Sequence, residues 1–204
     1  MPACRPISFV AAMLATAALL HVAPRTAAQT AGSVAGQLLV ASPSIGDPRF
    51  ARTVIVMVRH DQDGAFGIVI NRLVREAPLA TVLELLGEKD VAGVGTVRLF
   101  AGGPVQPELG FVVHGADYHG PGTMEINARL AVTASREVLL DIARGKGPQH
   151  PLVAFGYSGW GPGQLEGELK RRDWAIAPAE PKLVLEADRD QVWDAAYAQR
   201  TQDL

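Results

Sequence analysis

The chain has 204 residues, of which 48% are hydrophobic and 20% are charged, and its formal net charge is −2. This length and composition are typical of one globular domain with a sizeable core. The slightly acidic balance disfavours nucleic acid as a partner, because the chain lacks the positive field that holds phosphate backbones. The single cysteine, Cys4, lies in a segment that we expect to be removed, which excludes a disulfide framework, thiolate catalysis and a Cys-ligated metal.

The first segment of the chain is predicted to be an export signal. Arg5 precedes an almost unbroken apolar run from Phe9 to Leu20, and small residues ending at Ala28 offer a cleavage site. The run is shorter than the roughly 20 residues that a membrane-spanning helix needs. We therefore expect residues 1–28 to be a signal peptide and 29–204 to be a periplasmic or secreted domain with no stable membrane span. The alternative is a mis-assigned start codon and a cytoplasmic protein.

The mature domain is predicted to begin with strands and one helix. Apolar and β-branched runs at 37–41, 54–58 and 66–70 predict three strands, and Asp63-Gly64 predicts a hairpin turn between the last two. Helical spacing of apolar residues, with a proline at the start and a glycine just past the end, predicts a helix from Pro78 to Leu86.

The second half of the chain is predicted to add more strands and three helices. Strand patterns occur at 97–100, 109–114, 123–126, 129–132, 152–155, 174–176 and 183–185. Helical patterns follow Ser135 and occupy residues 164–171 and about 189–198. Because the order of elements lacks a regular βαβ rhythm, we expect an α+β fold, a single compact domain with a mixed sheet and about four helices.

A glycine-rich segment from Gly156 to Leu169 is the densest motif. It does not match a phosphate-binding loop, because no lysine follows as in a P-loop. Ser158 does not match a hydrolase nucleophile elbow, because Trp160 stands where that motif needs glycine. Two interpretations remain, which are a tight strand-to-helix turn with Trp160 packed over it and a turn that contacts a ligand.

The histidines do not have the spacing of a metal site. His114 and Asp117 lie close in sequence, and His60 ends an earlier strand, but no specific ligand pattern is present, so we expect no metal and no cofactor. Asn71 follows a strand and fits a turn or a pocket. The basic cluster at residues 170–172 is interpreted as a helix C-terminus with charge matched to the helix dipole.

Several motifs together resemble the YqgE/AlgH family. They occur in this order: G-Q-L-L-V-A-S-P from Gly36, D-P-R-F from Asp47, His60, G-A-F-G-I-V-I-N-R from Gly64, G-G-P-V from Gly102, G-F-V-V-H ending at His114, the glycine-rich segment, and Trp174. The resemblance covers about 36–197. It implies a single α+β domain with a coiled mixed sheet. It implies little biochemistry, because members are largely uncharacterised, although a label of transcriptional regulator is attached to the family. Such proteins commonly begin near the G-Q-L-L segment without an export signal.

The preferred functional hypothesis is a non-enzymatic module of the cell envelope that binds a protein or a small ligand. We expect a surface cleft on one side of the fold, formed by His60, Asn71, Gly102, Gly103, His114, Trp160 and Gln164. One alternative is a cytoplasmic transcriptional regulator. Another is a hydrolase or metal-dependent enzyme that uses His60 and His114, with Asp117 or Glu166 as the acid or base.

Overall fold

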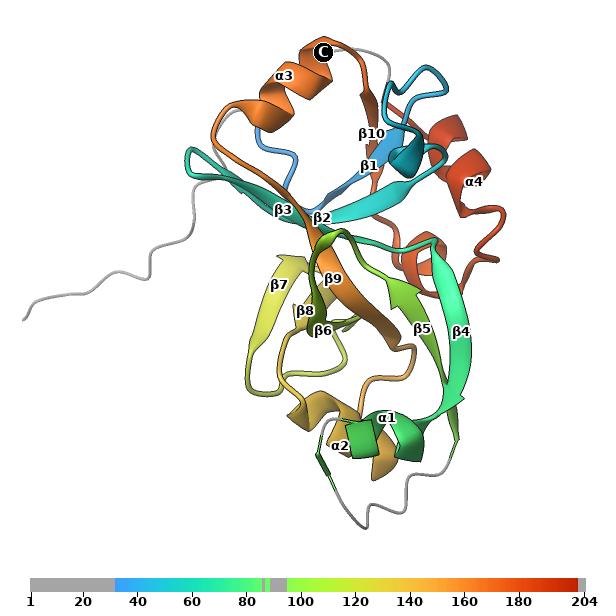
Figure 1. Cartoon of the computed structure of the whole chain (residues 1–204). Helices are drawn as coiled ribbons and strands as arrows, with labels where there is room; N and C mark the ends of the chain where they lie inside the picture. The colour runs from blue at the N-terminus through green and yellow to red at the C-terminus, as the bar shows by residue number, and fades with distance from the viewer. Residues whose placement is uncertain (1–31, 86, 89–94, 202–204) are drawn as a thin grey trace, which may run out of the picture.

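The computed structural model describes residues 32–85, 87–88 and 95–201 (Figure 1). The predicted signal peptide, residues 1–28, lies outside the described residues. Among those that are described, no helix is long and apolar enough to cross a membrane.

Within the described residues, ten strands form one curled sheet whose centre is the long strand β9. The strands are β1 (Gln37–Ala41), β2 (Val54–Asp61), β3 (Gly64–Val69), β4 (Leu73–Pro78), β5 (Thr96–Ala101), β6 (Val105–Gly115), β7 (Thr123–Asn127), β8 (Leu130–Thr133), β9 (Leu152–Trp160) and β10 (Trp174–Pro178). The main path is β10-β1-β2-β3-β9-β6-β8-β7. Strand β5 pairs with β9 in parallel and with β4 in antiparallel orientation, so the sheet is mixed as predicted.

Strand β9 joins the two halves of the molecule. Its first residues, from Leu152 to Phe155, pair with β5 and β6, and its last residues, from Ser158 to Trp160, pair with β3. Figure 1 shows β9 passing from the lower half, with β4 to β8, into the upper half, with β1 to β3 and β10. One strand therefore contributes side chains to both halves of the core.

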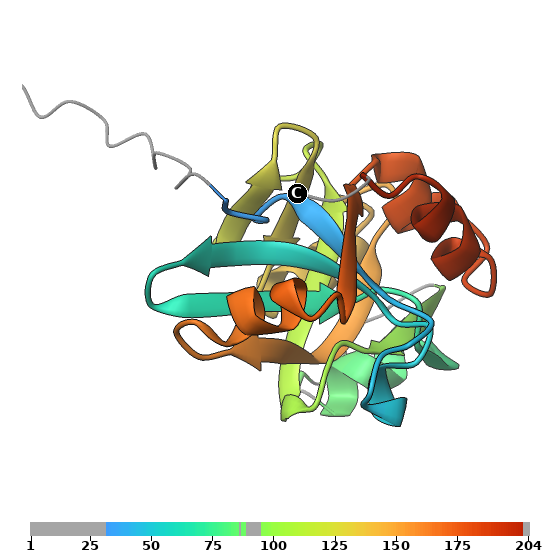
Figure 2. The same ribbon diagram turned by 90° about the horizontal axis from the view of Figure 1, so that it is seen from above.

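In the part of the chain that the structure describes, four α-helices and two shorter helical turns cover the sheet. They are η1 (Pro48–Phe50), α1 (Leu79–Leu85), α2 (Glu137–Ala143), α3 (Gln164–Lys170), η2 (Lys182–Glu186) and α4 (Val192–Ala198). Helices α1 and α2 pack at the lower end, and α3 and α4 lie at the upper end (Figure 1). Figure 2 shows α3, drawn in orange, lying across the strands of the upper half. The α+β architecture with about four helices is confirmed.

Local chemistry explains the hairpin between β2 and β3. The backbone N–H of Asp63 donates to the Asp61 carboxylate at 2.9 Å, which closes the turn. Gly64 has φ of 125° and passes so close to the Trp160 carbonyl that a side chain would overlap it. The predicted hairpin is therefore confirmed, with the turn one residue earlier than predicted, at Gln62-Asp63, and it brings β3 against the end of β9.

Three sequence predictions of secondary structure are wrong. The run Leu183–Leu185 forms part of the π-helical turn η2, because all three side chains are buried and a short apolar run does not distinguish strand from helix. The segment Gly156–Trp160 continues β9 as a strand instead of turning. The last helix begins at Val192, three residues later than the predicted start at residue 189. Strand β4 is a further element without a sequence prediction, since five of its six residues are exposed.

Candidate functional site

Helix α3 is fixed to the upper half of the sheet by one carboxylate. Glu168 Oε2 accepts hydrogen bonds from the indole N–H groups of Trp160 and Trp174, each at 2.8 Å. Its Oε1 accepts from the Gln164 amide at 3.1 Å, and the Gln164 oxygen accepts from Gly161 N–H at 3.2 Å. The two indoles also meet edge to face, with ring centroids 6.2 Å apart. These contacts orient α3 over strands β9 and β10.

A cavity of about 460 Å³ lies between α3, the end of β9 and the loop that contains η1. We call it the Ser158 cleft. Its walls include three aromatic side chains, Phe50, Trp160 and Trp174. Ser158 lines it with only 2% of its surface exposed, and its hydroxyl has no hydrogen-bond partner within the part of the chain that the structure describes. Buried hydroxyl groups in proteins are usually paired, so the Ser158 hydroxyl is the unexplained polar group at this cleft.

Each arginine that lines the Ser158 cleft is paired with a carboxylate. Arg49 contacts Asp47 at 2.6 Å and Arg171 contacts Asp173 at 2.8 Å. The pKa of Asp47 is lowered mainly because its side chain accepts hydrogen bonds from the Arg49 side chain and backbone. The same pairing raises the pKa of Arg49. Each arginine of the rim is therefore offset by its own carboxylate.

Asn71 holds the loop that forms one wall of the cleft. Its side-chain oxygen accepts from Val54 N–H at 2.9 Å, and its amide donates to the Arg52 carbonyl at 2.8 Å. The next residue, Arg72, donates to the carbonyls of residues 49 and 51. The loop supplies Phe50 to the cleft. Asn71 thus does not line the Ser158 cleft but fixes one of its walls.

The two glycines after β5 allow another loop to cross β9 next to Ser158. A Cβ on Gly102 would overlap the Gly156 carbonyl, and one on Gly103 would overlap the backbone of Tyr157. The Gly102 backbone also bridges two strands, since its N–H donates to the Phe155 carbonyl at 2.7 Å and its carbonyl accepts from Val69 N–H at 2.8 Å. The following residue, Pro104, lines the cleft.

His60 contacts helix α3, which also lines the Ser158 cleft. Its Nδ1 accepts from Val34 N–H at 3.1 Å, so Nε2 carries the proton and donates to Glu166 Oε1 at 3.1 Å. The imidazole is buried, with 8% of the residue exposed. Both ring nitrogens are therefore engaged in holding the N-terminal segment and α3 to the sheet.

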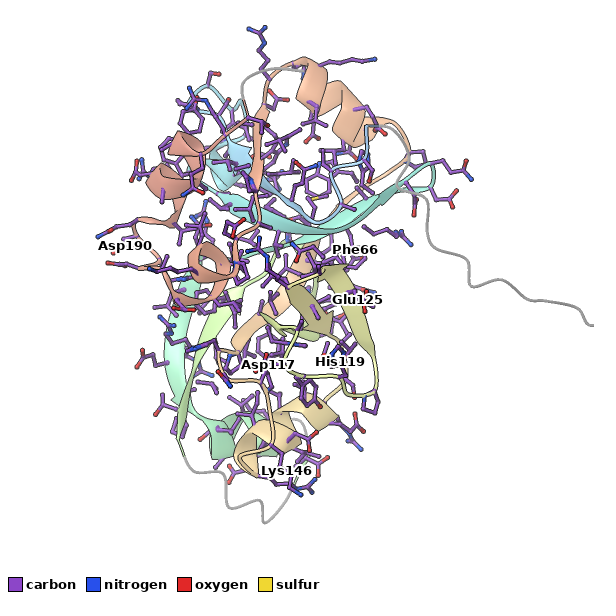
Figure 3. All side chains as sticks on the ribbon, turned by 180° about the vertical axis from the view of Figure 1, so that it is seen from behind. Phe66, Asp117, His119, Glu125, Lys146 and Asp190 are labelled. Carbon is purple, nitrogen blue, oxygen red and sulfur yellow. The ribbon has the colours of Figure 1, made fainter. Side chains whose placement is uncertain are left out.

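His114 lies in a different part of the core. Its Nδ1 donates to the Gly115 carbonyl at 2.6 Å and its Nε2 accepts from the Thr133 hydroxyl at 2.9 Å. Burial lowers the pKa of His114, which keeps the imidazole neutral near pH 7. Figure 3 labels Asp117 and His119, which follow it, in the lower half of the molecule. Within the described ranges, no group of three or more His, Cys, Asp or Glu side chains could hold a metal ion.

The seven residues predicted to share a cleft are thus divided. Two of them, His60 and Trp160, contact helix α3, and a third, Gln164, is its first residue. Only Trp160 and Gln164 line the Ser158 cleft. The glycines at 102 and 103 let the loop after β5 cross β9 beside the cleft, Asn71 fixes its outer wall, and His114 lies elsewhere.

Of the residues that line this cleft, only Trp160 and Gln164 were predicted as site residues, and those missed include Phe50, Ser158, Glu168 and Trp174. The spacing of Gln164 and Glu168, four residues apart on one helix, is a signal that could have linked the carboxylate to the site. Phe50 and Trp174 stand in two of the ordered motifs. The missing partner of Ser158 depends on the packing of three separate segments, so no local pattern reveals it.

Comparison with known proteins places the chain in a family. A family model described as AlgH-like matches residues 38–204. The chain belongs to this AlgH-like family. A UPF0301 protein of Sphingopyxis alaskensis is 43% identical over 164 residues, which are 80% of this chain and 87% of that protein. A UPF0301 protein of Methylococcus capsulatus is 43% identical over 161 residues, which are 79% of this chain and 88% of that protein.

The AlgH-like fold is also shared with solved structures. The solution structure of AlgH from Pseudomonas aeruginosa is similar with a TM-score of 0.71 and 38% identity, over 81% of this chain and 88% of that one. A crystal structure of a Corynebacterium diphtheriae protein shares the fold, with a TM-score of 0.62 and 24% identity, over 82% and 87% of the two chains. The resemblance to the YqgE/AlgH family is therefore confirmed. The range matched by the AlgH-like model contains every residue that lines the Ser158 cleft.

Proposed function

We propose that this AlgH-like protein is a non-enzymatic binding module that holds a small uncharged ligand with hydroxyl groups in the Ser158 cleft. The observation that carries the proposal is the Ser158 hydroxyl, which is buried, lines the cleft and lacks a partner within the described residues. Leaving a buried hydroxyl unpaired costs about 1–3 kcal/mol. A ligand hydroxyl that pairs with Ser158 recovers this energy on binding.

The other walls of the cleft support an uncharged ligand with an apolar face. Its volume of about 460 Å³ falls within the usual range for small-molecule sites. The arginines are already paired with Asp47 and Asp173, so an anionic ligand would have to displace a carboxylate. The aromatic rings offer surface for the C–H groups of a ring. These features together match the chemistry of a neutral saccharide.

The surroundings of the candidate acid and base residues support binding without catalysis. A serine nucleophile needs a base within hydrogen-bond reach of its hydroxyl. Both nitrogens of His60 are engaged by Val34 and Glu166, and both nitrogens of His114 are engaged in the lower half of the core. The hydrolase that uses these two histidines is therefore the less favoured alternative.

The three tryptophans provide a direct test of the proposal. The indole N–H groups of Trp160 and Trp174 point to Glu168 at the cleft, whereas that of Trp193 donates to the Ala41 carbonyl at 2.9 Å. We expect that at least one sugar in a panel of neutral mono- and disaccharides shifts the first two indole signals in a ¹H–¹⁵N correlation spectrum. The Trp193 signal should remain in place.

The variant Ser158→Ala separates binding from folding. It removes an unpaired buried hydroxyl, so the free energy of unfolding should stay equal or rise by about 1 kcal/mol. Affinity for the sugar should fall about tenfold, which corresponds to the loss of one hydrogen bond of about 1.4 kcal/mol. Ser135→Ala, at the start of α2, serves as the control and should retain binding. If no sugar shifts the two indole signals, or Ser158→Ala binds as tightly as the unaltered protein, the proposal is wrong.

We further propose that the module acts in the cell envelope. The support is the order of Arg5, the apolar run and the small residues before Gln29 in the sequence. Fractionation of the native host, with the intact mass of the recovered protein, tests this part. A periplasmic product that begins near Gln29 is expected. A cytoplasmic product that begins near the G-Q-L-L segment contradicts the export and leaves the cytoplasmic alternative.

A further inference from the structure

A second cavity lies on the other side of Trp174 and differs from the Ser158 cleft in charge. Its volume is about 700 Å³, and three basic side chains line it: Lys170, Arg172 and Arg200. None of the described residues that line it is acidic. We call it the basic cavity. Among the described residues, its walls hold no carboxylate that offsets these cations, whereas each arginine of the Ser158 cleft is paired with a carboxylate.

The basic cluster at the end of α3 is divided between the two cavities. Arg171 lines the Ser158 cleft and pairs with Asp173. Its neighbours Lys170 and Arg172 line the basic cavity instead. The sequence interpretation of residues 170–172 as charge that matches the helix dipole does not explain why two of the three line one cavity. A ligand with negative charge would explain why Lys170 and Arg172 line the same cavity.

Arg172 occupies a backbone position that favours glycine. Its φ is 61°, in the left-handed region, directly after the C-cap of α3. Arg172 N–H donates to the Leu169 carbonyl at 2.9 Å, and Asp173 N–H donates to the Glu168 carbonyl at 3.0 Å, which is the usual bonding of a helix that ends in glycine. An arginine here costs about 1 kcal/mol relative to glycine. Turn geometry therefore does not account for the arginine, whereas its place in the basic cavity does.

In the basic cavity, the Arg200 side chain is held in a defined orientation, and other walls are apolar. The Arg200 guanidinium lies 4.2 Å from the centroid of the Tyr197 ring and donates to the Tyr197 carbonyl at 2.8 Å. Leu169, Trp174 and Ile176 add apolar surface. An inorganic anion would leave this surface and most of the volume unused.

We propose that the basic cavity binds an organic phosphate, in which a phosphoryl group is attached to an apolar or aromatic body. A phosphate carries about −1.5 to −2 charges and three strong acceptor oxygens, which suit the three cations. Trp174 and the neighbouring apolar side chains receive the organic body. This site is separate from the Ser158 cleft and does not rest on the function proposed for it.

Phenyl phosphate is a suitable probe, with inorganic phosphate and phenol as its two halves. We expect phenyl phosphate to bind at least tenfold more tightly than either half, with an affinity that falls as salt is added. Trp174 lines both cavities, whereas Trp160 lines only the Ser158 cleft of the two. Phenyl phosphate should therefore shift the Trp174 indole signal and leave Trp160 unchanged. Equal binding of inorganic phosphate, or a shift of Trp160, would overturn the proposal.

The variant Arg172→Gly separates this role from folding. It relieves the left-handed backbone, so the melting temperature should stay equal or rise, while the affinity for phenyl phosphate should fall at least tenfold. Arg144→Ala removes an equal charge at the end of α2 and should change neither property. Sedimentation with phosphatidylglycerol vesicles distinguishes a lipid headgroup from a soluble phosphate. Vesicle binding without phenyl phosphate binding, or full affinity in Arg172→Gly, would contradict the assignment.

Discussion

Replacing Gly103 with alanine is expected to lower the free energy of unfolding by about 3 kcal/mol or more. The new Cβ would overlap the backbone carbon and oxygen of Tyr157, which lie in the central strand β9. Backbone atoms of a strand paired on both sides do not move without breaking sheet hydrogen bonds, so the clash cannot be relieved locally. Urea unfolding of both proteins measures the change.

Gly161 provides the matched control for this prediction. It directly follows the same strand, and a Cβ there would meet no atom within 4 Å. Gly161→Ala should therefore change the free energy of unfolding by less than about 0.5 kcal/mol. If Gly103→Ala were as stable as Gly161→Ala, the close crossing of the 102–104 loop over β9 would be wrong. The wall that this loop contributes to the Ser158 cleft would then also be wrong.

Replacing Glu168 with alanine is expected to cost about 2–3 kcal/mol of stability and to open the Ser158 cleft. The carboxylate accepts from both indoles and from Gln164, and it is half-buried. Hydrogen bonds to a charged acceptor contribute about 1.5–3 kcal/mol each, and partial exposure reduces the sum. Without the carboxylate, the indole N–H groups of Trp160 and Trp174 lose their partner.

Glu168→Gln distinguishes the hydrogen bonds from the shape of the side chain. The amide keeps one acceptor oxygen and nearly the same volume, so it should recover about half of the stability lost in Glu168→Ala. Both variants can be measured by urea unfolding and by the exchange rates of the indole protons. Unchanged exchange at Trp160 and Trp174 in Glu168→Ala would show that Glu168 does not hold the two rings in place.

Local sequence chemistry predicts the elements whose signals lie within a few residues. The hairpin turn just before Gly64 and the helix Leu79–Leu85 are of this kind, since turn-forming residues and a helical period determine them. The predicted strand at 152–155 is shorter than β9, because Gly156 and Gly159 are residue types that favour a turn. Gly156 is instead a site of close approach by the Gly103 backbone, and that contact between distant segments is a property of the tertiary fold.

The candidate site shows the same division between local and long-range information. Trp160 and Gln164 were predicted because they stand in one glycine-rich motif, and the structure places both at the Ser158 cleft. His114 was grouped with them because histidines often carry chemistry, but its neighbours are Thr133 and Tyr118 in the lower half. The partnerless hydroxyl of Ser158 follows from the packing of η1, β9 and α3, which lie far apart in sequence.

The most direct test of the Ser158 cleft is a crystal structure of the protein with the neutral sugar that shifts the Trp160 and Trp174 indole signals. The account predicts a sugar hydroxyl at hydrogen-bond distance, about 2.7–2.8 Å, from the Ser158 Oγ atom, with the ring against an aromatic wall. A sugar bound elsewhere, or a Ser158 hydroxyl paired with a protein group, would contradict it.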